Sequence, residues 1–433
     1  MHRRTTLSRG LQGVLAAAAM TAAAGLAQAQ TTAPAALDLK QAFDAAWARQ
    51  PEAVALAARQ DAARAAKQAA TSWTPEPVAL ELAGKTDRLN RNRGSRETEL
   101  GLAVPIWLPG ERGSSVALAE AEGQAAESRA KAAQWRVAAT VRDAWWQWQR
   151  AHIDADVARA QLDNAQRIAA DVARRQRAGD LARADANQAE GAVATAQSAL
   201  AKAEADVSAA RQRLQATTGL RGLAAPTARV SEVEPVMPTA ASTGTTSATS
   251  DPGPEVATHA AVAELKDRAA VAQRAAALAR TQSRANPELT VSVTNERGAF
   301  GEPRQQTVAL GLRIPFGGGT RHGARVAQAL ADSTEAQAQL AIERDRVAAE
   351  QESAVARVAA ARAQLAAAER RSVLAVETRG FFDKSFRLGE TDLPTRLRIE
   401  AEATDAERQA GRAGIELAAA ISSLRQALGL LPQ

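Results

Sequence analysis

Four short segments of the chain alternate apolar and polar residues with the period of two that is typical of a strand with one apolar face. The segments are residues 78–83, 98–104, 289–294 and 307–314. Two polar loops, residues 84–96 and 295–304, join them in pairs. The pattern predicts two β-hairpins, and strands of about ten residues are long enough to cross a bilayer when they are tilted.

Most of the remaining chain is rich in alanine, with larger apolar residues such as Trp145 and Trp148 at helical spacing. Two stretches without proline, residues 111–177 and 320–387, predict helices about 100 Å long at 1.5 Å per residue. Trp146 cannot share a face with both of its neighbouring tryptophans. We therefore interpret Trp145 and Trp148 as the residues that anchor this helix to its neighbours.

Shorter helices are predicted over residues 37–73, 182–216, 255–284 and 395–427. Two of them together have about the length of one long helix. We therefore expect the short helices to stack end to end in pairs, with 255–284 on 182–216 and with 37–73 on 395–427.

The chain contains an internal repeat. The stretch LGLAVPIWLPGER at residues 100–112 returns about 210 positions later as LGLRIPFGGGTR at residues 310–321, and Gly179 maps in the same way onto Gly389. A repeat with this spacing indicates a tandem duplication. The predicted organisation is a signal peptide at 1–29, a first repeat at 30–220, a polar linker at 221–254 and a second repeat at 255–433.

The N-terminus has a basic start, an apolar stretch and a small-x-small site at Ala27-Gln28-Ala29, which predicts export. No later run of eighteen apolar residues follows, so only strands could carry the chain across a membrane. Cysteine is absent, which excludes disulfides and thiolate metal sites.

The net charge of +6 does not indicate a nucleic-acid partner, because the arginines alternate with glutamates at helical spacing, as on a solvated helix face. The histidines of the mature chain, His152, His259 and His322, are far apart in the predicted plan. The glycines at 317–319 lack the lysine of a nucleotide-binding loop. We therefore expect no enzyme activity, no cofactor and no metal site.

Four strands are too few to close a barrel, and an open sheet edge in lipid leaves backbone groups unpaired. Two copies of the chain would supply the eight strands of the smallest membrane barrels, and three would supply twelve. Two ordinary hairpins on a soluble core remain the alternative. That alternative is weakened because no other apolar segment is available to cover the strands.

The punctuated strand ends at residues 100–112 and 310–321, together with the repeated turn, resemble the TolC family of outer-membrane efflux ducts. The resemblance implies a mainly α fold with a small β part: long helical hairpins form a periplasmic α-barrel, and four strands per chain join a trimeric twelve-stranded barrel. It also implies a homotrimer in outer-membrane lipid that passes substrates from an inner-membrane pump of the resistance-nodulation-division type and its periplasmic adaptor. Residues 286–303, followed by 313–321, are most similar to the heavy-metal branch, the CzcC/CusC-like proteins, which implies metal cations as cargo.

Each punctuated motif marks a strand that converts into a helix, because proline and glycine end ladder pairing and turn the chain. The residues of these transitions are Pro105, Trp107, Gly110 and Arg112 in the first repeat, and Pro315, Phe316, Gly319 and Arg321 in the second.

Residues 177–185 and 386–396 resemble the two periplasmic tips of the family. Carried over, the adaptor-docking residues are Gly179, Leu181, Ala182, Gly389 and Leu393, and the gate residues are Asp185, Phe386, Glu390 and Asp392. A plain reversal between two helices would also require the glycines. The family's gate tyrosine and arginine positions are Phe386 and Thr391 in this chain, so Glu390 and Asp392 are hypothesised to supply the acidic groups of the gate.

Two further alternatives stay open. A periplasmic coiled-coil adaptor or scaffold would need one hairpin between compact β-rich halves, whereas this chain has two hairpins. The basic residues of the loop between the first two strands either contact lipid-A phosphates or form a solvated loop. These residues are Lys85, Arg88, Arg91, Arg93 and Arg96.

Overall fold

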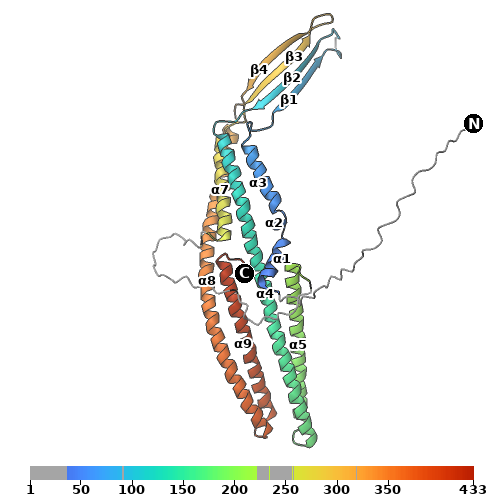
Figure 1. Cartoon of the computed structure of the whole chain (residues 1–433), viewed down its shortest axis with the longest axis vertical. Coiled ribbons are helices and arrows are strands. Elements are labelled where there is room, and N and C mark those ends of the chain that lie inside the picture. The colour runs from blue at the N-terminus through green and yellow to red at the C-terminus, as the bar shows by residue number, and fades with distance from the viewer. Residues whose placement is uncertain (1–36, 90–91, 222–233, 235–255, 257, 318) are drawn as a thin grey trace, which may run out of the picture. The chain divides into compact units, whose positions relative to one another are not determined.

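The computed structural model describes residues 37–89, 92–221, 234, 256, 258–317 and 319–433, all within the unit Ala36–Gln433. The predicted signal peptide lies outside the described residues, as does the predicted linker except for Arg221 and Glu234. The described chain is mainly helical with one small antiparallel sheet, which confirms the predicted fold class (Figure 1). No described helix combines the length and the apolar character that a membrane crossing requires.

The sheet has the strand order β1-β2-β3-β4. Its strands are β1 (Ala79–Thr86), β2 (Arg96–Pro105), β3 (Glu288–Arg297) and β4 (Gln305–Arg313). The register aligns Leu80, Leu102, Val291 and Leu310 in one row, and Leu82, Leu100, Val293 and Val308 in a second row two positions along each strand. Because side chains two positions apart share a face, both rows lie on the same face.

The first hairpin is longer than the apolar pattern predicts. Residues 84–86 and 96 belong to the paired strands and not to the loop, since Lys85 pairs with Glu97 and Thr86 with Arg96. The alternation of apolar and polar residues ends before the backbone hydrogen bonding between the strands does. The polar ends of the strands could therefore not be recognised from the sequence pattern.

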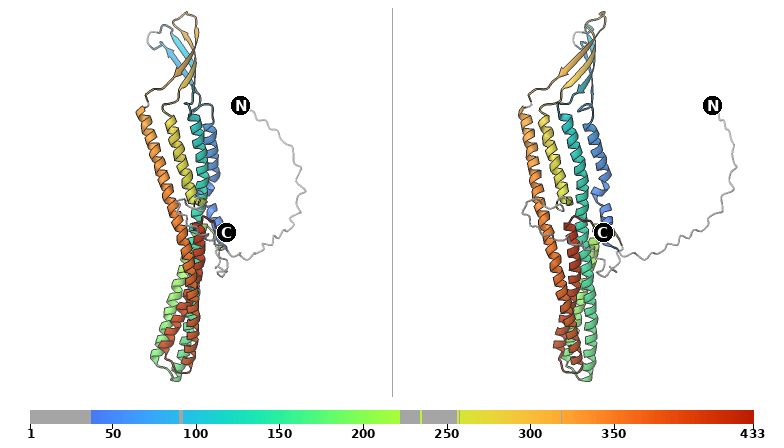
Figure 2. Two further views of the ribbon diagram at one scale, coloured as in Figure 1. Left: turned by 90° about the vertical axis from the view of Figure 1, so that its left-hand side faces the viewer. Right: turned by 60° about the vertical axis from the view of Figure 1, so that its left-hand side comes forward.

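Two long helices run as predicted, to within one residue at each end: α4 (Glu111–Ala178) and α8 (Gly319–Arg387). Each turns back into a shorter helix, α5 (Arg183–Thr218) after α4 and α9 (Leu393–Ala427) after α8. The two hairpins lie side by side, because α9 also packs against α4. The helix α7 (Ala260–Thr281) packs between α4 and α8 (Figure 2).

The prediction of one helix over residues 37–73 is wrong. Three helices occupy this part of the chain: α1 (Leu39–Ala48), α2 (Pro51–Val54) and α3 (Leu56–Ala70). Pro51 begins α2, and the preceding residue Gln50 is extended, with φ −70° and ψ 139°. Proline has no N–H to donate and disfavours helical backbone in the residue before it, so the helix breaks here.

The predicted stacking of the short helices is also wrong, because the partners are exchanged. The end of α5 meets the end of α1, where Arg49 Nη1 donates to the carbonyl of Ala216 at 3.2 Å. The end of α9 meets the start of α7, since a Cβ at Gly429 would lie 3.1 Å from the His259 ring. Each return helix therefore continues into the opening helix of its own half. Helix length could not distinguish these pairings, because the short helices have similar lengths.

The main apolar core lies where α1, α4, α5 and α9 meet. Trp145, Trp146 and Trp148 are all buried there, together with Phe43 of α1 and Leu214 of α5. Trp145 and Trp148 anchor α4 to its neighbours as predicted, and Trp146, for which no contact was predicted, is buried as well. A face of α4 that would be exposed in a two-helix hairpin is covered by a third and a fourth helix.

Candidate functional site

The two helical hairpins reverse at Gly179 and Gly389, and both tips lie at the end of the helices remote from the sheet (Figures 1 and 2). Both glycines have left-handed backbone, with φ 91° and 79°, which other residues rarely adopt. Leu393 of the second tip is buried with Ile168 and other apolar residues, and Leu181 packs against this cluster from the first tip. The structure thus brings the two predicted tips together.

Phe386, which we expected at the gate, lies inside the contact between the tips. Its ring is only 2% exposed. The guanidinium carbons of Arg175 and Arg396 lie 4.8 and 4.6 Å from the ring centroid, within the range of a cation–π interaction. This placement makes Phe386 part of the packing that joins the two hairpins.

Arg175 is a residue that the sequence did not single out. Its Nη1 donates to the carbonyl of Phe386 at 3.0 Å, and its Nη2 donates to the carbonyl of Arg387 at 3.2 Å. These carbonyls are at the C-terminal end of α8, where the helix dipole is negative. Arg175 therefore fastens the end of α4 to the end of α8. In the sequence it looked like any basic residue in the last turn of its own helix.

Asp383 connects the two helices of the second hairpin close to its tip. Its two carboxylate oxygens accept from Arg396 and Arg387, each at 2.5 Å. Arg396 is in the first turn of α9, so this pairing closes the α8–α9 hairpin beneath the ring of Phe386.

The predicted acidic gate residues lie at helix ends. Asp185 accepts from the backbone N–H of Ala182 at 3.0 Å in the first turn of α5, and Asp392 caps α9 by accepting from the N–H of Thr395 at 3.2 Å. The hydrogen bonds from Thr395 lower the pKa of Asp392. Glu390 accepts from the hydroxyl of Ser385 at 3.4 Å. These contacts account for the carboxylates as capping and turn groups, and a gate role remains a prediction.

Behind the tips, α4, α8 and α9 enclose a groove of about 1070 Å³ lined with arginines and carboxylates. Within it, Arg379 pairs with Glu400 at 3.4 Å and with Glu407 at 3.2 Å. Burial raises the pKa of Glu400, and the charge of Arg379 opposes this shift. The groove is therefore polar and contains charges of both signs.

The first strand-to-helix transition is tightly organised. The strand β2 ends at Pro105, and α4 begins after Gly110, whose φ is 80°. Glu111 is almost fully buried here, and its carboxylate accepts from the amides of Gln282 at 2.9 Å and Asn286 at 2.7 Å. Glu111 thus connects the transition to the end of α7 and the approach to β3. The sequence gave no sign of this role, because glutamate is common in the first turn of a helix.

Two predicted residues hold the same transition to the end of α3. The indole Nε1 of Trp107 donates to the carbonyl of Ser72 at 3.2 Å, and Arg112 donates to the carbonyl of Thr71 at 2.5 Å. The two side chains satisfy carbonyl groups that the end of the helix leaves without partners.

The second transition is open. Phe316, Gly319 and Arg321 are exposed, and Pro315 is half-buried. The difference follows from position: β2 and α4 have neighbours on both sides, whereas β4 and α8 form one edge of the molecule.

The same edge carries most of the uncovered large apolar side chains of the described helices. Of eight exposed large apolar residues on the described helices, seven belong to α8. These seven are Leu330, Ile342, Val355, Val373, Leu374, Val376 and Phe381. The apolar rows of the sheet are uncovered as well, with Leu82 and Leu310 each 75% exposed. Large apolar patches that remain exposed on one chain indicate an interaction surface.

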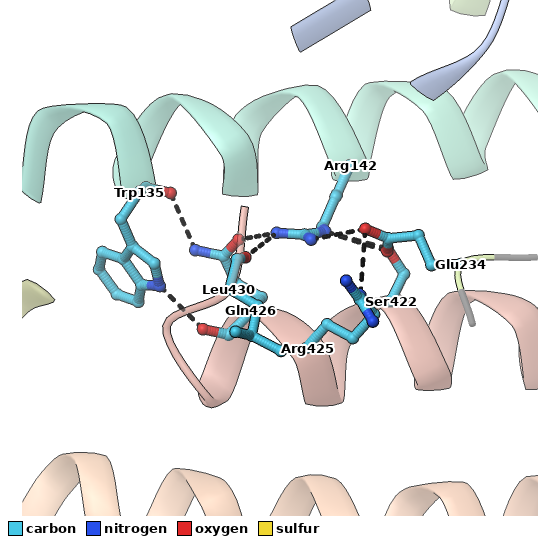
Figure 3. A network of polar contacts seen from close by, with 7 residues as sticks. All are labelled: Trp135, Arg142, Glu234, Ser422, Arg425, Gln426 and Leu430. Atoms are coloured by element: carbon cyan, nitrogen blue, oxygen red, sulfur yellow. Dashed lines mark hydrogen bonds and ion pairs between the residues drawn. The ribbon is translucent and has the colours of Figure 1, made fainter. Parts of the chain in front are cut away.

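A buried polar network joins α4 and α9 near the middle of the long helix (Figure 3). Glu234 is the only residue of the predicted linker interior that the structure describes, and its carboxylate accepts from Arg142 Nη2 at 2.8 Å and from the hydroxyl of Ser422 at 2.6 Å. Arg425 Nε lies 3.5 Å from the same carboxylate. All four side chains are at least 95% buried.

The network continues toward α7. Arg142 also donates to the side chain of Gln426 and to the carbonyl of Leu430, and Gln426 exchanges two hydrogen bonds with Trp135 (Figure 3). The Trp135 ring meets His259, the N-cap of α7, edge to face at 4.7 Å. Burial lowers the pKa of His259. The network therefore extends from α4 to the point where α9 meets α7.

The chain was compared with known families and structures. Residues 42–220 match the family described as Outer membrane efflux protein. No curated protein in the comparison matches the chain.

Solved structures extend the likeness to nearly the whole chain. It is similar to CusC, with 18% identity, a TM-score of 0.72 and coverage of 90% of this chain and 92% of that one. It is also similar to VceC of Vibrio cholerae, with 16% identity, a TM-score of 0.71 and coverage of 90% and 96%. The CmeC outer membrane channel of Campylobacter jejuni has 14% identity and a TM-score of 0.72, with coverage of 90% and 85%. The chain has the fold of these proteins.

Proposed function

We propose that the protein is the outer-membrane channel of a tripartite efflux system, and that it conducts substrates passively as a homotrimer. The observation that carries this proposal is the set of apolar side chains left uncovered on α8 and on one face of the sheet. A second copy covers the α8 edge, and lipid covers the sheet face. Three copies supply twelve strands, which close the sheet edges at β1 and β4.

The partners that we propose are a periplasmic adaptor and an inner-membrane pump of the resistance-nodulation-division type. The docking surface is the pair of tips, with Gly179, Leu181, Ala182, Gly389 and Leu393. The tips are supported for this role because they lie together at the end remote from the sheet, where Gly179 and Gly389 have open space in place of a side chain. The gate is formed in the same region by Asp185, Glu390 and Asp392.

The proposed cargo is heavy-metal cations, on the basis of the resemblance of residues 286–303 and 313–321 to the heavy-metal branch. In the described part of the chain no three histidine or carboxylate side chains are placed to hold a metal ion together. A channel that passes metal cations without binding them tightly needs no such group of side chains.

Membrane fractionation followed by an unheated SDS gel tests the proposal. We expect the protein in the outer-membrane fraction, with a band of three chains that becomes one chain on heating. A monomer that stays soluble without detergent would support the alternative of a periplasmic adaptor or scaffold.

A charge on the α8 edge is expected to prevent assembly. In Ile342→Glu, a residue that is 68% exposed on one chain is buried in the trimer with an unpaired carboxylate, at a cost of several kcal/mol per site. The trimer band on the unheated gel should be lost while the circular dichroism of the helices is retained. Gln337→Glu, on an exposed and already polar position of α8, is the matched control. If the trimer band of Ile342→Glu is as intense as that of the unmodified protein, the α8 edge is not a contact between copies.

A further inference from the structure

We propose that the sheet binds the phosphate groups of outer-leaflet lipid through an arginine row formed by Arg96 and Arg297. The inference rests on the proposed placement of the sheet in the outer membrane. The lipid that binds this surface is one with a phosphate-bearing headgroup.

The register separates the charges of the sheet between its two faces. Arg96 is paired with Arg297, and both lie an even number of positions from the apolar rows, on the same face as Leu100 and Val293. A row of uncharged residues, with Thr98 on β2, lies between the two arginines and the apolar rows. The arginine row therefore lies where the apolar surface ends.

The carboxylates of this region are on the opposite face. Glu97 and Glu296 are paired in the register, one position away from the arginine row, and Glu81 and Glu99 share their face. Lys85 is on that face too, and it pairs with Glu97 at 3.0 Å. The arginine row is therefore flanked along its strands by apolar and neutral side chains.

Within the arginine row, Arg297 is held in place by contacts between the two turns. Arg297 Nε donates to the carbonyl of Gly94 at 3.2 Å, and its guanidinium lies 5.5 Å from the ring centroid of Phe300. The N–H of Phe300 donates to the carbonyl of Arg93 at 2.9 Å. Gly94 has φ 95°, and a Cβ there would lie 2.6 Å from the Phe300 ring, so the two turns pack closely at this glycine. A site built in advance loses less conformational entropy when it binds a ligand.

The neighbouring arginines strengthen the positive field. Arg88, Arg93 and Arg304 are exposed near the same end of the sheet. Like the arginine row, they form no ion pair with any carboxylate in the described part of the chain. Basic side chains at the edge of an apolar membrane surface attract anionic headgroups. Each such side chain strengthens binding to an anionic lipid by about fivefold.

The other end of the apolar face has a different character. Trp73 and Phe316 are 93% and 82% exposed near the ends of the strands that join the helices. Aromatic residues are favoured at a membrane interface whatever its headgroups. The basic end is the end remote from the helices, so the phosphates that it meets belong to the outer leaflet.

The test uses the detergent-purified protein and native mass spectrometry, with lipid A as the probe and dephosphorylated lipid A as its matched partner. We expect lipid A to bind more tightly than the dephosphorylated form. In the double variant Arg96→Gln with Arg297→Gln, binding of lipid A should weaken roughly 30-fold, given the contribution of two arginines near an anionic surface. Lys85→Gln, next to the row but on the opposite face, should bind as the unmodified protein does.

Three results would overturn the proposal: equal binding of the two lipids, unchanged lipid A binding in the double variant, or displacement of lipid A by millimolar inorganic phosphate, which would indicate a site for the free anion. The variant Arg96→Lys with Arg297→Lys keeps the charge and should retain most of the binding. The unheated gel of the same samples distinguishes a failure of the arginine row from a failure of the proposed channel. A trimer without lipid A preference refutes only the arginine row, whereas a soluble monomer refutes the proposed channel.

Discussion

Replacing Glu234 by alanine is expected to destabilise the folded protein by about 3–5 kcal/mol, the cost of breaking a buried ion pair by removing one partner. Glu234 lies 2.8 Å from Arg142 and 3.5 Å from Arg425, and all three side chains are about 3–4% exposed. Without the carboxylate, two buried guanidinium groups lose an acidic partner that lies within 3.5 Å of each. Thermal unfolding of the purified protein, followed by circular dichroism, measures the loss.

Two comparisons make this result specific. Glu204→Ala removes a surface carboxylate that lies 3.7 Å from Arg159 with more than half of its side chain exposed, so it should cost less than about 1 kcal/mol. Acetate should restore part of the lost stability in Glu234→Ala, since it brings a carboxylate of similar shape to the same arginines, but it should not affect Glu204→Ala. Equal melting temperatures for the two variants would show that Glu234 does not neutralise the buried arginines.

The function of this network follows from its place in the fold. It lies where α9 ends and α7 begins, beside the unbroken helix α4. A junction between two stacked helices has unpaired carbonyls at one end and unpaired N–H groups at the other. Arg142 satisfies the carbonyl of Leu430 on one side of this junction, and Trp135 contacts both Gln426 and His259 across it. The network therefore fixes the junction to α4.

The sequence predicted those parts of the fold that depend on local patterns. Alternation located all four strands, because one face of each strand is apolar in this chain. Absence of proline and the glycines at 179 and 389 located the long helices and their turns to within one or two residues. Pro51 was visible as well, and its effect on the helix over 37–73 was overlooked.

The parts that were missed depend on contacts between distant segments. The partners of α5 and α9 in stacking are set by side chains such as Arg49 and His259, which have no periodic signal. Glu234 lies in a Ser/Thr/Gly/Pro-rich stretch that looks like a linker, and only its three-dimensional neighbours Arg142 and Arg425 reveal its burial. Glu111 was missed for the same reason.

At the candidate site the sequence located the two turns at Gly179 and Gly389, but it gave no sign of the contacts that the neighbouring side chains make. The resemblance to known channels pointed to Phe386 as a gate residue, whereas its ring is enclosed by the two hairpins. Arg175, which joins the two tips, and Asp383, which closes the second tip, belong to ordinary helical turns and carry no motif. Their contacts arise only when the end of α4 meets the end of α8 and when α9 folds back on α8.

Replacing Arg175 by alanine is expected to open the proposed channel at its tips. The variant loses two hydrogen bonds from a charged group to the carbonyls of Phe386 and Arg387, and it loses the cation–π contact with the Phe386 ring. One hydrogen bond of this kind contributes about 1.5–3 kcal/mol, so the loss of both should raise the population with separated tips by at least roughly 10- to 100-fold. Single-channel recording in a planar bilayer should show higher conductance and a longer open time.

Arg174→Ala is the matched control, because the adjacent side chain is 65% exposed and pairs only with Asp171 on its own helix. It should leave the conductance unchanged. Arg396→Gln weakens the other side of the same contact and should shift the conductance in the same direction as Arg175→Ala, so the test does not depend on one variant. If both variants form trimers whose conductance equals that of the unmodified protein, the contact around Phe386 has only a structural role, and opening must be controlled by groups elsewhere on the tips, with Asp185, Glu390 and Asp392 as the next residues to replace.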